Sequence, residues 1–244
     1  MHRFYANDNG VINGFAALTD EDTIHALRVL RLKTGDAVEL MCGGVRYAGE
    51  IAETEGSSAK VRIISEIASA EPTLRITLYQ GLPKSDKMDL IVQKATEIGV
   101  HAIVPVLMER CVSRPDPSDL ARKCDRWQKI AREAGKQSGR EQIPEIQTPA
   151  RLSALSVPFS SHDAVIVPWE DQEGYGPKAF VSEHPNLRSL GIVIGPEGGI
   201  SAEEIDRLKQ DGCRPITLGP RILRTETAGL AALCAIMCLY GEME

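Results

Sequence analysis

Residues 190–233 read LGIVIGPEGGISAEEIDRLKQDGCRPITLGPRILRTETAGLAAL, and two short apolar runs in this stretch each stop at a Gly-Pro pair. The runs are 190–194 and 215–218. Proline cannot donate to a sheet ladder and glycine has no Cβ, so each stop ends strand pairing and leaves backbone open to a flat ligand. Small molecules bind at the carboxyl ends of strands in open α/β sheets. We therefore expect a binding site at the two stops.

From Leu74 onward, apolar runs typical of strands alternate with helical patterns. The expected strands before residue 190 are 74–80, 102–108 and 164–169. The expected helices run from 85 or 86 to 98, from about 118 to 137, and onward from 177. Ser201 begins a capping box for a further helix that ends near Asp211. This alternation predicts an α/β domain over residues 74–244, with a mainly parallel sheet and helices on its faces.

Residues 1–70 are β-rich instead. The patterns predict strands at 37–42, 45–53 and 59–67, the first two joined as a hairpin by Gly43-Gly44. Thr19 is expected to cap a short helix that runs to about Arg31. Several short strands around one helix indicate a small barrel. Residues 68–73 form the expected linker.

Composition limits the class of protein. The first ten residues contain no apolar core for a signal peptide, and the longest apolar run, 228–240, is too short to span a bilayer. The six cysteines form no CxxC pair, and the five histidines form no HxxxH or HExxH motif. We therefore expect no metal, no membrane and a reducing cytoplasmic setting.

Basic side chains gather despite the net charge of −6. Residues 121–140 hold seven basic and two acidic side chains, while Leu120, Trp127 and Ala131 share the apolar face of the same predicted helix. Such a surplus suits phosphate oxygens, although a solvated helix face has the same pattern. Further cations follow the carboxyl ends of predicted parallel strands and should converge on one rim: Lys84, Lys87, Arg110, Arg114, Arg221 and Arg224.

Three features near the two stops keep alternative interpretations open. Glu197, the only carboxylate in the segment 195–199, either accepts a proton or caps backbone N–H groups at the next helix. Thr225 caps the final helix, or the free N–H groups there bind an anion, or both. The final helix is apolar nearly all round, which fits burial within one subunit or against a second one.

Other motifs are weak or missing. Residues 174–179 match GxGxxA, but four residues separate them from the preceding strand and no acidic ribose partner follows at the usual spacing. The sequence has neither GxxxxGK[ST] nor GxSxG. A nucleotide-dependent oxidoreductase is therefore a weakly supported interpretation. A non-enzymatic RNA-binding protein is a second alternative.

The segments IGPEGGIS and LGPRILRTETAGLAAL closely resemble the ribosomal RNA small subunit methyltransferase E family, within the SPOUT class of knotted methyltransferases. Nearly the whole chain shares the resemblance, through HALRVLRLKTGD (25–36), KSDKMDLIVQKATEIGV (84–100), ERCVSR (109–114) and RWQKIAREAGKQSGR (126–140). Gly229 departs from it, because alanine is more common there. The resemblance implies a PUA-like RNA-binding β-barrel over 1–70, a deep trefoil knot within 74–244, and a homodimer.

The resemblance also implies S-adenosylmethionine as the cofactor, with the site close to the subunit interface. Gly198 is expected to leave room for its adenine or ribose. The implied cofactor-binding residues are Pro168, Ile194, Gly195, Pro196, Glu197, Gly198, Leu218, Gly219, Arg221, Ile222, Leu223, Thr225 and Ala228.

The implied reaction is methylation of N3 of a specific uridine in 16S rRNA, near the decoding region. Uracil N3 must lose a proton before it attacks the methyl group, so we expect Arg224, with Arg3 or Arg28, to stabilise the anionic base. Glu197 is a candidate general base, and water or hydroxide is the alternative. Because aromatic residues are only 5% of the chain, recognition by shape and phosphates is expected, which favours the assembled small ribosomal subunit as substrate. The expected RNA-binding residues are Arg3, Arg28, Arg31, Lys84, Lys87, Arg110, Arg126, Lys136 and Arg140.

Overall fold

The computed structural model describes residues 2–7, 9–55 and 58–243, and the chain divides into two compact units. The first unit comprises residues 1–71 with 135–142, and the second comprises 72–134 with 143–244. The segment 135–142, which the sequence places in the α/β domain, thus belongs to the β-rich unit.

The first unit is built on a five-stranded sheet in the order β1-β3-β4-β5-β2. β1 pairs with β3 in parallel, and the other pairs are antiparallel. The predicted Gly43-Gly44 hairpin is confirmed, because both glycines have the positive φ that such a turn requires (60° and 77°). An isolated antiparallel bridge joins Ala6 and Leu18, which follow the two edge strands. The strands are β1 (His2–Tyr5), β2 (Phe15–Ala17), β3 (Ala37–Cys42), β4 (Val45–Glu55) and β5 (Ser58–Ile67).

One helix covers this sheet's core. Helix α1 (Asp20–Ile24) continues as a π-helical turn over His25–Val29. The Thr19 hydroxyl accepts the backbone N–H of Asp22 at 3.2 Å, so the predicted cap is confirmed. Phe4, Leu40 and other apolar side chains of the strands are fully buried beneath the helix.

Ion pairs explain why residues 135–142 belong to the first unit. The Arg140 guanidinium pairs with Glu71 at 2.7 Å, and the Tyr5 hydroxyl donates to the Arg140 carbonyl at 2.7 Å. The Lys136 ammonium lies 2.9 Å from an oxygen of the buried Asp22. These partners are far away in sequence, so the pattern of charges along 121–140 gave no sign of them.

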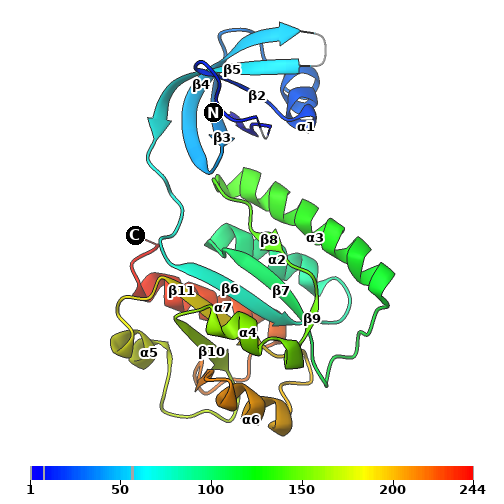
Figure 1. Ribbon diagram of the computed structural model, residues 1–244, viewed down its shortest axis with the longest axis vertical. Helices are drawn as coiled ribbons and strands as arrows, with labels where there is room; N and C mark the ends of the chain where they lie inside the picture. Colours follow the sequence, from blue (N-terminus) through cyan, green and yellow to red (C-terminus); the bar gives the residue numbers. More distant parts are fainter. Residues whose placement is uncertain (1, 8, 56–57, 244) are drawn as a thin grey trace. The chain divides into compact units, whose positions relative to one another are not determined.

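The second unit contains a parallel sheet in the order β12-β10-β11-β6-β7-β8, with β9 also paired to β7 (Figure 1). This confirms the predicted parallel sheet. The sequence missed the short elements between 145 and 160, which are too brief to produce a period. The strands are β6 (Arg75–Gly81), β7 (Ala102–Leu107), β8 (Glu145–Ile146), β9 (Ala150–Arg151), β10 (Ala164–Pro168), β11 (Ser189–Ile194) and β12 (Arg214–Ile216).

Helices flank this sheet (Figure 1). Helix α2 ends at Gly99, which has a φ of 110°, and Ser201 forms the predicted capping box with Glu204. No helix in the described part of the chain is long and apolar enough to cross a membrane. The helices are α2 (Lys87–Ile98), α3 (Pro117–Ser138), α4 (Ser156–Ser160), α5 (Pro177–Glu183), α6 (Ala202–Gln210) and α7 (Thr225–Leu239), with a 3₁₀ turn at Leu152–Ala154.

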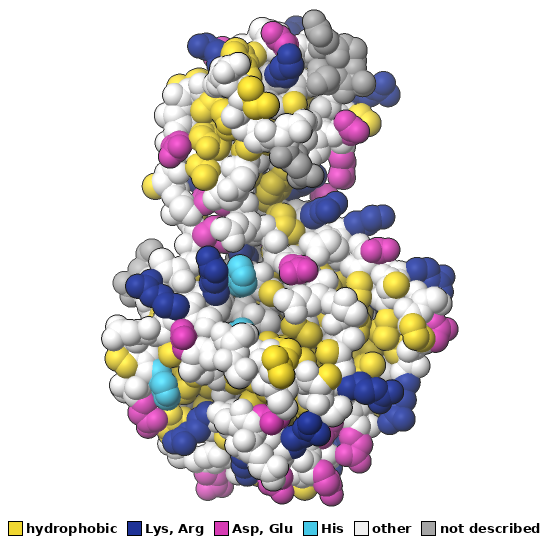
Figure 2. Space-filling model, in the orientation of Figure 1, with side chains coloured by type: hydrophobic (Ala, Val, Ile, Leu, Met, Phe, Trp, Pro, Cys, Tyr) yellow, Lys and Arg dark blue, Asp and Glu magenta, His cyan; other side chains and the backbone are white. Residues whose placement is uncertain are grey.

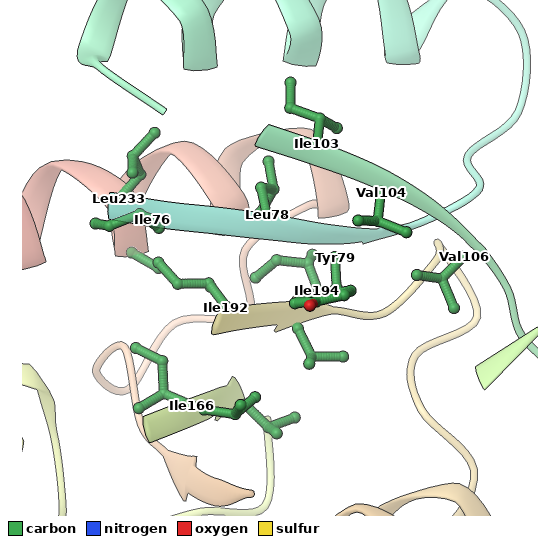
Figure 3. Close-up of a cluster of buried hydrophobic side chains, with 14 of the residues drawn as sticks. Ile76, Leu78, Tyr79, Ile103, Val104, Val106, Ile166, Ile192, Ile194 and Leu233 are labelled. Carbon is green, nitrogen blue, oxygen red and sulfur yellow. The ribbon is translucent and has the colours of Figure 1, made fainter. Parts of the chain in front are cut away.

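The core forms on both faces of β6, because successive strand residues point in opposite directions. Leu78 and Tyr79 lie on opposite sides of the strand in Figure 3, where Leu233 of α7 lies near Ile76. Tyr79 meets Phe159 of α4 with 5.0 Å between ring centroids. Helix α7 packs against α2, β6 and β11, so the last helix of the chain covers the middle of the sheet.

Two helices bury the faces that the sequence indicates. Trp127 and Ala131 of α3 are buried, as their spacing predicts. Helix α7 buries Leu233 and Ile236 against the sheet, whereas Leu239 remains 42% exposed. Within the described residues, α7 therefore has a covered face and a partly uncovered apolar one.

Candidate functional site

A cavity of about 950 Å³ lies where β10, β11 and β12 end. Three segments form its walls: 168–174 after β10, 194–200 after β11, and 217–225 after β12, with Ala228 of α7. Both Gly-Pro stops line the cavity, so the fold brings the two stretches into one site. It also brings together the implied cofactor-binding residues, all of which line this cavity.

The loop 195–199, here called the glycine loop, has little room for side chains. A Cβ added at Gly195 would lie 2.8 Å from Cγ1 of Ile200, and Gly199 has a φ of 74°. A Cβ at Gly198 would lie 2.9 Å from the Arg110 Cβ. The expectation that Gly198 leaves room for adenine or ribose therefore needs correction, because the space beside it is filled by Arg110.

Glu197 is held by groups at the start of α2. Its carboxylate accepts the backbone N–H of Lys84 at 3.0 Å and pairs with the Lys87 ammonium at 3.1 Å. Burial alone would raise its pKa, but hydrogen bonds from its own N–H and from Lys84 and Lys87 outweigh burial and hold the pKa below its ordinary value. A lowered pKa makes this carboxylate a weaker base, and its contacts fix the glycine loop against the end of β6.

Lys87 bridges two elements of the site. Besides Glu197, its ammonium pairs with Glu226 of α7 at 3.0 Å. The two carboxylates, Glu226 first, raise the Lys87 pKa. The sequence suggests that Lys87 faces RNA phosphates, but the side chain lies between carboxylates and is 29% exposed. Lys87 thus ties the glycine loop to the last helix.

Thr225 does not cap α7. It is the first residue inside the helix, and the N-cap position belongs to Arg224, whose side chain makes no capping bond. The Thr225 hydroxyl instead donates to the Gly195 carbonyl at 2.6 Å and accepts from Nε2 of Gln80 at 2.9 Å. The capping interpretation fails because the hydroxyl reaches the end of β11.

The segment 217–225 carries exposed side chains on the cavity wall. Arg221 and Arg224 are both exposed, and within the described chain Arg224 forms no salt bridge. Ile222, between them, is 87% exposed. An exposed cation that forms no salt bridge at a cavity wall is suited to an anionic ligand.

Among the predicted RNA-binding residues of the second unit, Lys84, Lys87 and Arg110 converge on the glycine loop. Arg110 donates to the Gly198 carbonyl at 3.0 Å, whereas Arg114 donates to the Glu109 carbonyl. Arg126 pairs with Asp89 of α2. On the face shown in Figure 2, Lys and Arg side chains of this unit are interspersed with Asp and Glu.

The predicted RNA-binding residues of the first unit differ in exposure. Arg28 and Arg31 are exposed, and Arg3 pairs with Glu39 at 2.8 Å. Arg140 is only 7% exposed and is held by Glu71. The prediction that Arg140 presents its charge to RNA is therefore wrong, because the guanidinium holds the segment 135–142 in the first unit.

Sequence reasoning missed two parts of the site. The first part follows β10 and lines the cavity with Trp169, Glu170 and Glu173. The sequence did contain a signal for it, because a third predicted strand ends at this edge of the sheet. Gly174, from the GxGxxA segment, lines it as well. Gln80 gave no signal, because a glutamine at the end of an apolar run looks like the end of a strand.

The sequence matches two family models. Residues 70–237 match the RNA methyltransferase domain, and residues 18–64 match the RNA methyltransferase PUA domain. The ribosomal RNA small subunit methyltransferase E of Bacillus subtilis is 36% identical over 90% of this chain and 88% of its own length. That of Aquifex aeolicus is 32% identical over 97% of this chain and 99% of its own.

Two solved structures resemble this chain in both fold and sequence. A ribosomal RNA small subunit methyltransferase E from Neisseria gonorrhoeae, bound to S-adenosyl methionine, matches with a TM-score of 0.81 and 32% identity over 98% of each chain. A putative methyltransferase from Legionella pneumophila, in complex with the same cofactor, matches with a TM-score of 0.82 and 30% identity over 97% of this chain and 96% of its own. Together with the family models and the full-length relatives, they establish that the chain belongs to the ribosomal RNA small subunit methyltransferase E family.

Proposed function

We propose that the protein transfers a methyl group from S-adenosylmethionine to ribosomal RNA of the small subunit, at N3 of a uridine. The observation that carries this proposal is the cavity at the ends of β10, β11 and β12, whose walls include every residue that the family resemblance implies for the cofactor. The relatives named above act on the same class of RNA by name, and two neighbours hold this cofactor.

The cavity suits S-adenosylmethionine in size and chemistry. Its volume of about 950 Å³ lies at the upper end of the range for small-molecule sites. Glycines at 195, 198 and 219 leave backbone groups on the walls, and Glu170 and Glu173 supply negative charge for a cationic ligand. When bound, the cofactor supplies an electrophilic methyl group on a sulfonium.

Arg224 is the residue that we assign to the target base. The uracil imide would lose its N3 proton to solvent water or hydroxide and take the methyl group, whose bond to sulfur would break and leave S-adenosylhomocysteine. The guanidinium would stabilise the anionic ring. Its exposure leaves the guanidinium accessible for that role, while its charge, acting against burial, also lowers the pKa of Glu226. Glu197 is assigned to hold the glycine loop, because Lys84 and Lys87 already occupy its oxygens.

Three features of the family fold belong to the same proposal. A trefoil knot is proposed from the family resemblance, and the Thr225–Gly195 hydrogen bond places the chain after β12 against the glycine loop, as such a knot requires. A closed barrel in the first unit is supported by the Ala6–Leu18 bridge. A homodimer is supported by the uncovered apolar side of α7, where Leu239 is exposed.

Arg28 and Arg31 are exposed in the PUA-type unit, and we propose that they contact 16S rRNA within the assembled subunit. The six free cysteines suit a cytoplasmic setting.

Calorimetric titration tests the cofactor: S-adenosylmethionine is expected to bind and NAD is not. Binding of NAD alone would favour an oxidoreductase, and binding of neither would favour a non-enzymatic RNA-binding protein.

A further inference from the structure

Gln80, the penultimate residue of β6, is fully buried and lies beside the cavity without lining it. We propose that Gln80 is a positioning residue that locks two walls of the cofactor cavity together through the Thr225 hydroxyl. The inference rests on the proposed binding of S-adenosylmethionine. Gln80 itself touches neither cofactor nor RNA in this proposal, so its effect reaches the ligand only through the loops that it holds.

The hydrogen bonds run in one direction. Nε2 of Gln80 donates to the Gly81 carbonyl at 3.0 Å and to the Thr225 hydroxyl at 2.9 Å. A hydroxyl has one proton, and the oxygen of Thr225 already accepts from Gln80, so that proton goes to the Gly195 carbonyl 2.6 Å away. The chain of donors thus leads from β6 through α7 to the first residue of the glycine loop.

The neighbouring groups decide the orientation of the Gln80 amide. A flipped amide would place Oε1 against the Gly81 carbonyl, two acceptors facing each other, and would remove the donor to Thr225. In the observed orientation, Oε1 has no hydrogen-bond partner among the described residues. A Cβ added at Gly229 of α7 would lie 3.3 Å from that oxygen. The glycine therefore leaves room for an amide whose unpaired oxygen is unfavourable in a core.

An unpaired buried oxygen implies that the two N–H groups of Gln80 matter at this place. A leucine of similar size would fill the same space without an unsatisfied polar atom. What leucine would lose is the connection of three elements, since β6 also touches the Gly-Pro stop directly: a Cβ at Gly81 would lie 2.6 Å from the Pro196 nitrogen. The amide thus joins the end of β6, the glycine loop and α7 at one point.

This connection affects ligand binding because both loops line the cavity. The segment 217–224 leads directly into Thr225, and the glycine loop begins at Gly195. Without the Gln80–Thr225 bond, both segments sample other arrangements, and the ligand must order them on binding. The expected result is weaker cofactor binding with unchanged chemistry once the cofactor is bound.

Calorimetry with S-adenosylmethionine tests the proposal on Gln80→Leu, Thr225→Val and the double variant. Gln80→Leu is expected to raise Kd about tenfold, and Thr225→Val at least as much, because valine also removes the bond to Gly195. The double variant is expected to match Thr225→Val, since the Gln80 amide acts through that hydroxyl. Thr225→Ser keeps the hydroxyl and both of its hydrogen bonds, so its Kd should lie well below that of Thr225→Val. At saturating cofactor, kcat of Gln80→Leu should return to within about twofold of the wild-type value.

Tyr79→Phe is the matched control. Tyr79 is the preceding residue of β6 on the opposite face, and its hydroxyl lies 2.8 Å from Nε2 of His162, so the variant loses one buried hydrogen bond away from the cavity. It should lower the melting temperature and leave Kd unchanged.

Wild-type Kd for Gln80→Leu, additive effects in the double variant, or an equal loss of affinity in Tyr79→Phe would each overturn the proposal. If Gln80→Leu fails to fold, the Kd values of Thr225→Val and Thr225→Ser test the same chain of bonds, and a wild-type Kd for Thr225→Val overturns the proposal. A wild-type protein that does not bind S-adenosylmethionine overturns the proposed function instead.

Discussion

Replacing Lys87 by methionine removes the charge that bridges Glu197 and Glu226. Both carboxylates lie about 3 Å from the Lys87 nitrogen, so their nearest oxygens are at most about 6 Å apart. At that separation and an effective dielectric constant of about 20, two like charges repel by roughly 3 kcal/mol. Because all three side chains keep some contact with water, we expect Lys87→Met to lower the free energy of unfolding by about 1–2 kcal/mol at neutral pH.

The pH dependence of this loss tests its cause. In the wild type, hydrogen bonds outweigh burial and hold the pKa values of Glu197 and Glu226 below the ordinary carboxyl value, so they stabilise the fold above that value and this contribution is lost in acid. Without the lysine, protonation relieves the repulsion. The difference between wild type and variant should therefore be largest at neutral pH and shrink as the pH falls through about 4.5.

Urea denaturation between pH 4 and pH 8 measures this difference. Lys94→Met is the control, since Lys94 pairs at 2.8 Å with Glu97 on the same helix, but that pair is more exposed. The control should change stability by less than about 0.5 kcal/mol at every pH. A loss for Lys87→Met that stays constant across this range, or that equals the control, would refute the assigned role of Lys87.

Three further substitutions probe other contacts. Gly198→Ala places a Cβ 2.9 Å from the Arg110 Cβ; it should raise the Kd for S-adenosylmethionine at least about tenfold by calorimetry, and unchanged affinity would mean that the loop yields without cost. Arg224→Ala should cut methyl transfer at least about 100-fold while Kd changes by less than about threefold; a large rise in Kd would assign Arg224 to the cofactor instead. Glu242 accepts the backbone N–H groups of Thr73 and Leu74 at 2.9 and 3.0 Å. Glu242→Gln weakens this acceptor and should lower the free energy of unfolding in urea by about 1–2 kcal/mol at pH 7. An unchanged denaturation midpoint would show that these bonds add nothing to stability.

Local chemistry was sufficient to predict the α/β unit. Ser201 and Glu204 form their capping box, Gly99 ends α2, and the Gly-Pro stops at 195–196 and 219–220 meet at one cavity. Each of these signals is a short-range constraint on backbone conformation, which the sequence displays directly. The position of the binding site at this edge of the sheet was predictable as well, because parallel strands place their carboxyl ends together.

The partners of charged and hydroxyl groups could not be predicted. In the sequence, Arg140 is the last of the basic residues in the segment 121–140. Only the fold shows that it pairs with Glu71, which is 69 residues away in the chain. Thr225 looks like a cap until the fold brings Gly195 within reach. Such contacts depend on tertiary structure, which no period or spacing encodes, and the same is true of the role of Glu197.

The base atom that receives the methyl group tests the central claim most directly. Purified protein, S-adenosylmethionine and small ribosomal subunits that lack the modification are incubated, and the rRNA is digested to nucleosides for mass spectrometry. The proposed function predicts N3-methyluridine in stoichiometric yield, with slower methylation of protein-free rRNA. A methyl group on ribose, on another base or on no nucleoside at all would contradict it.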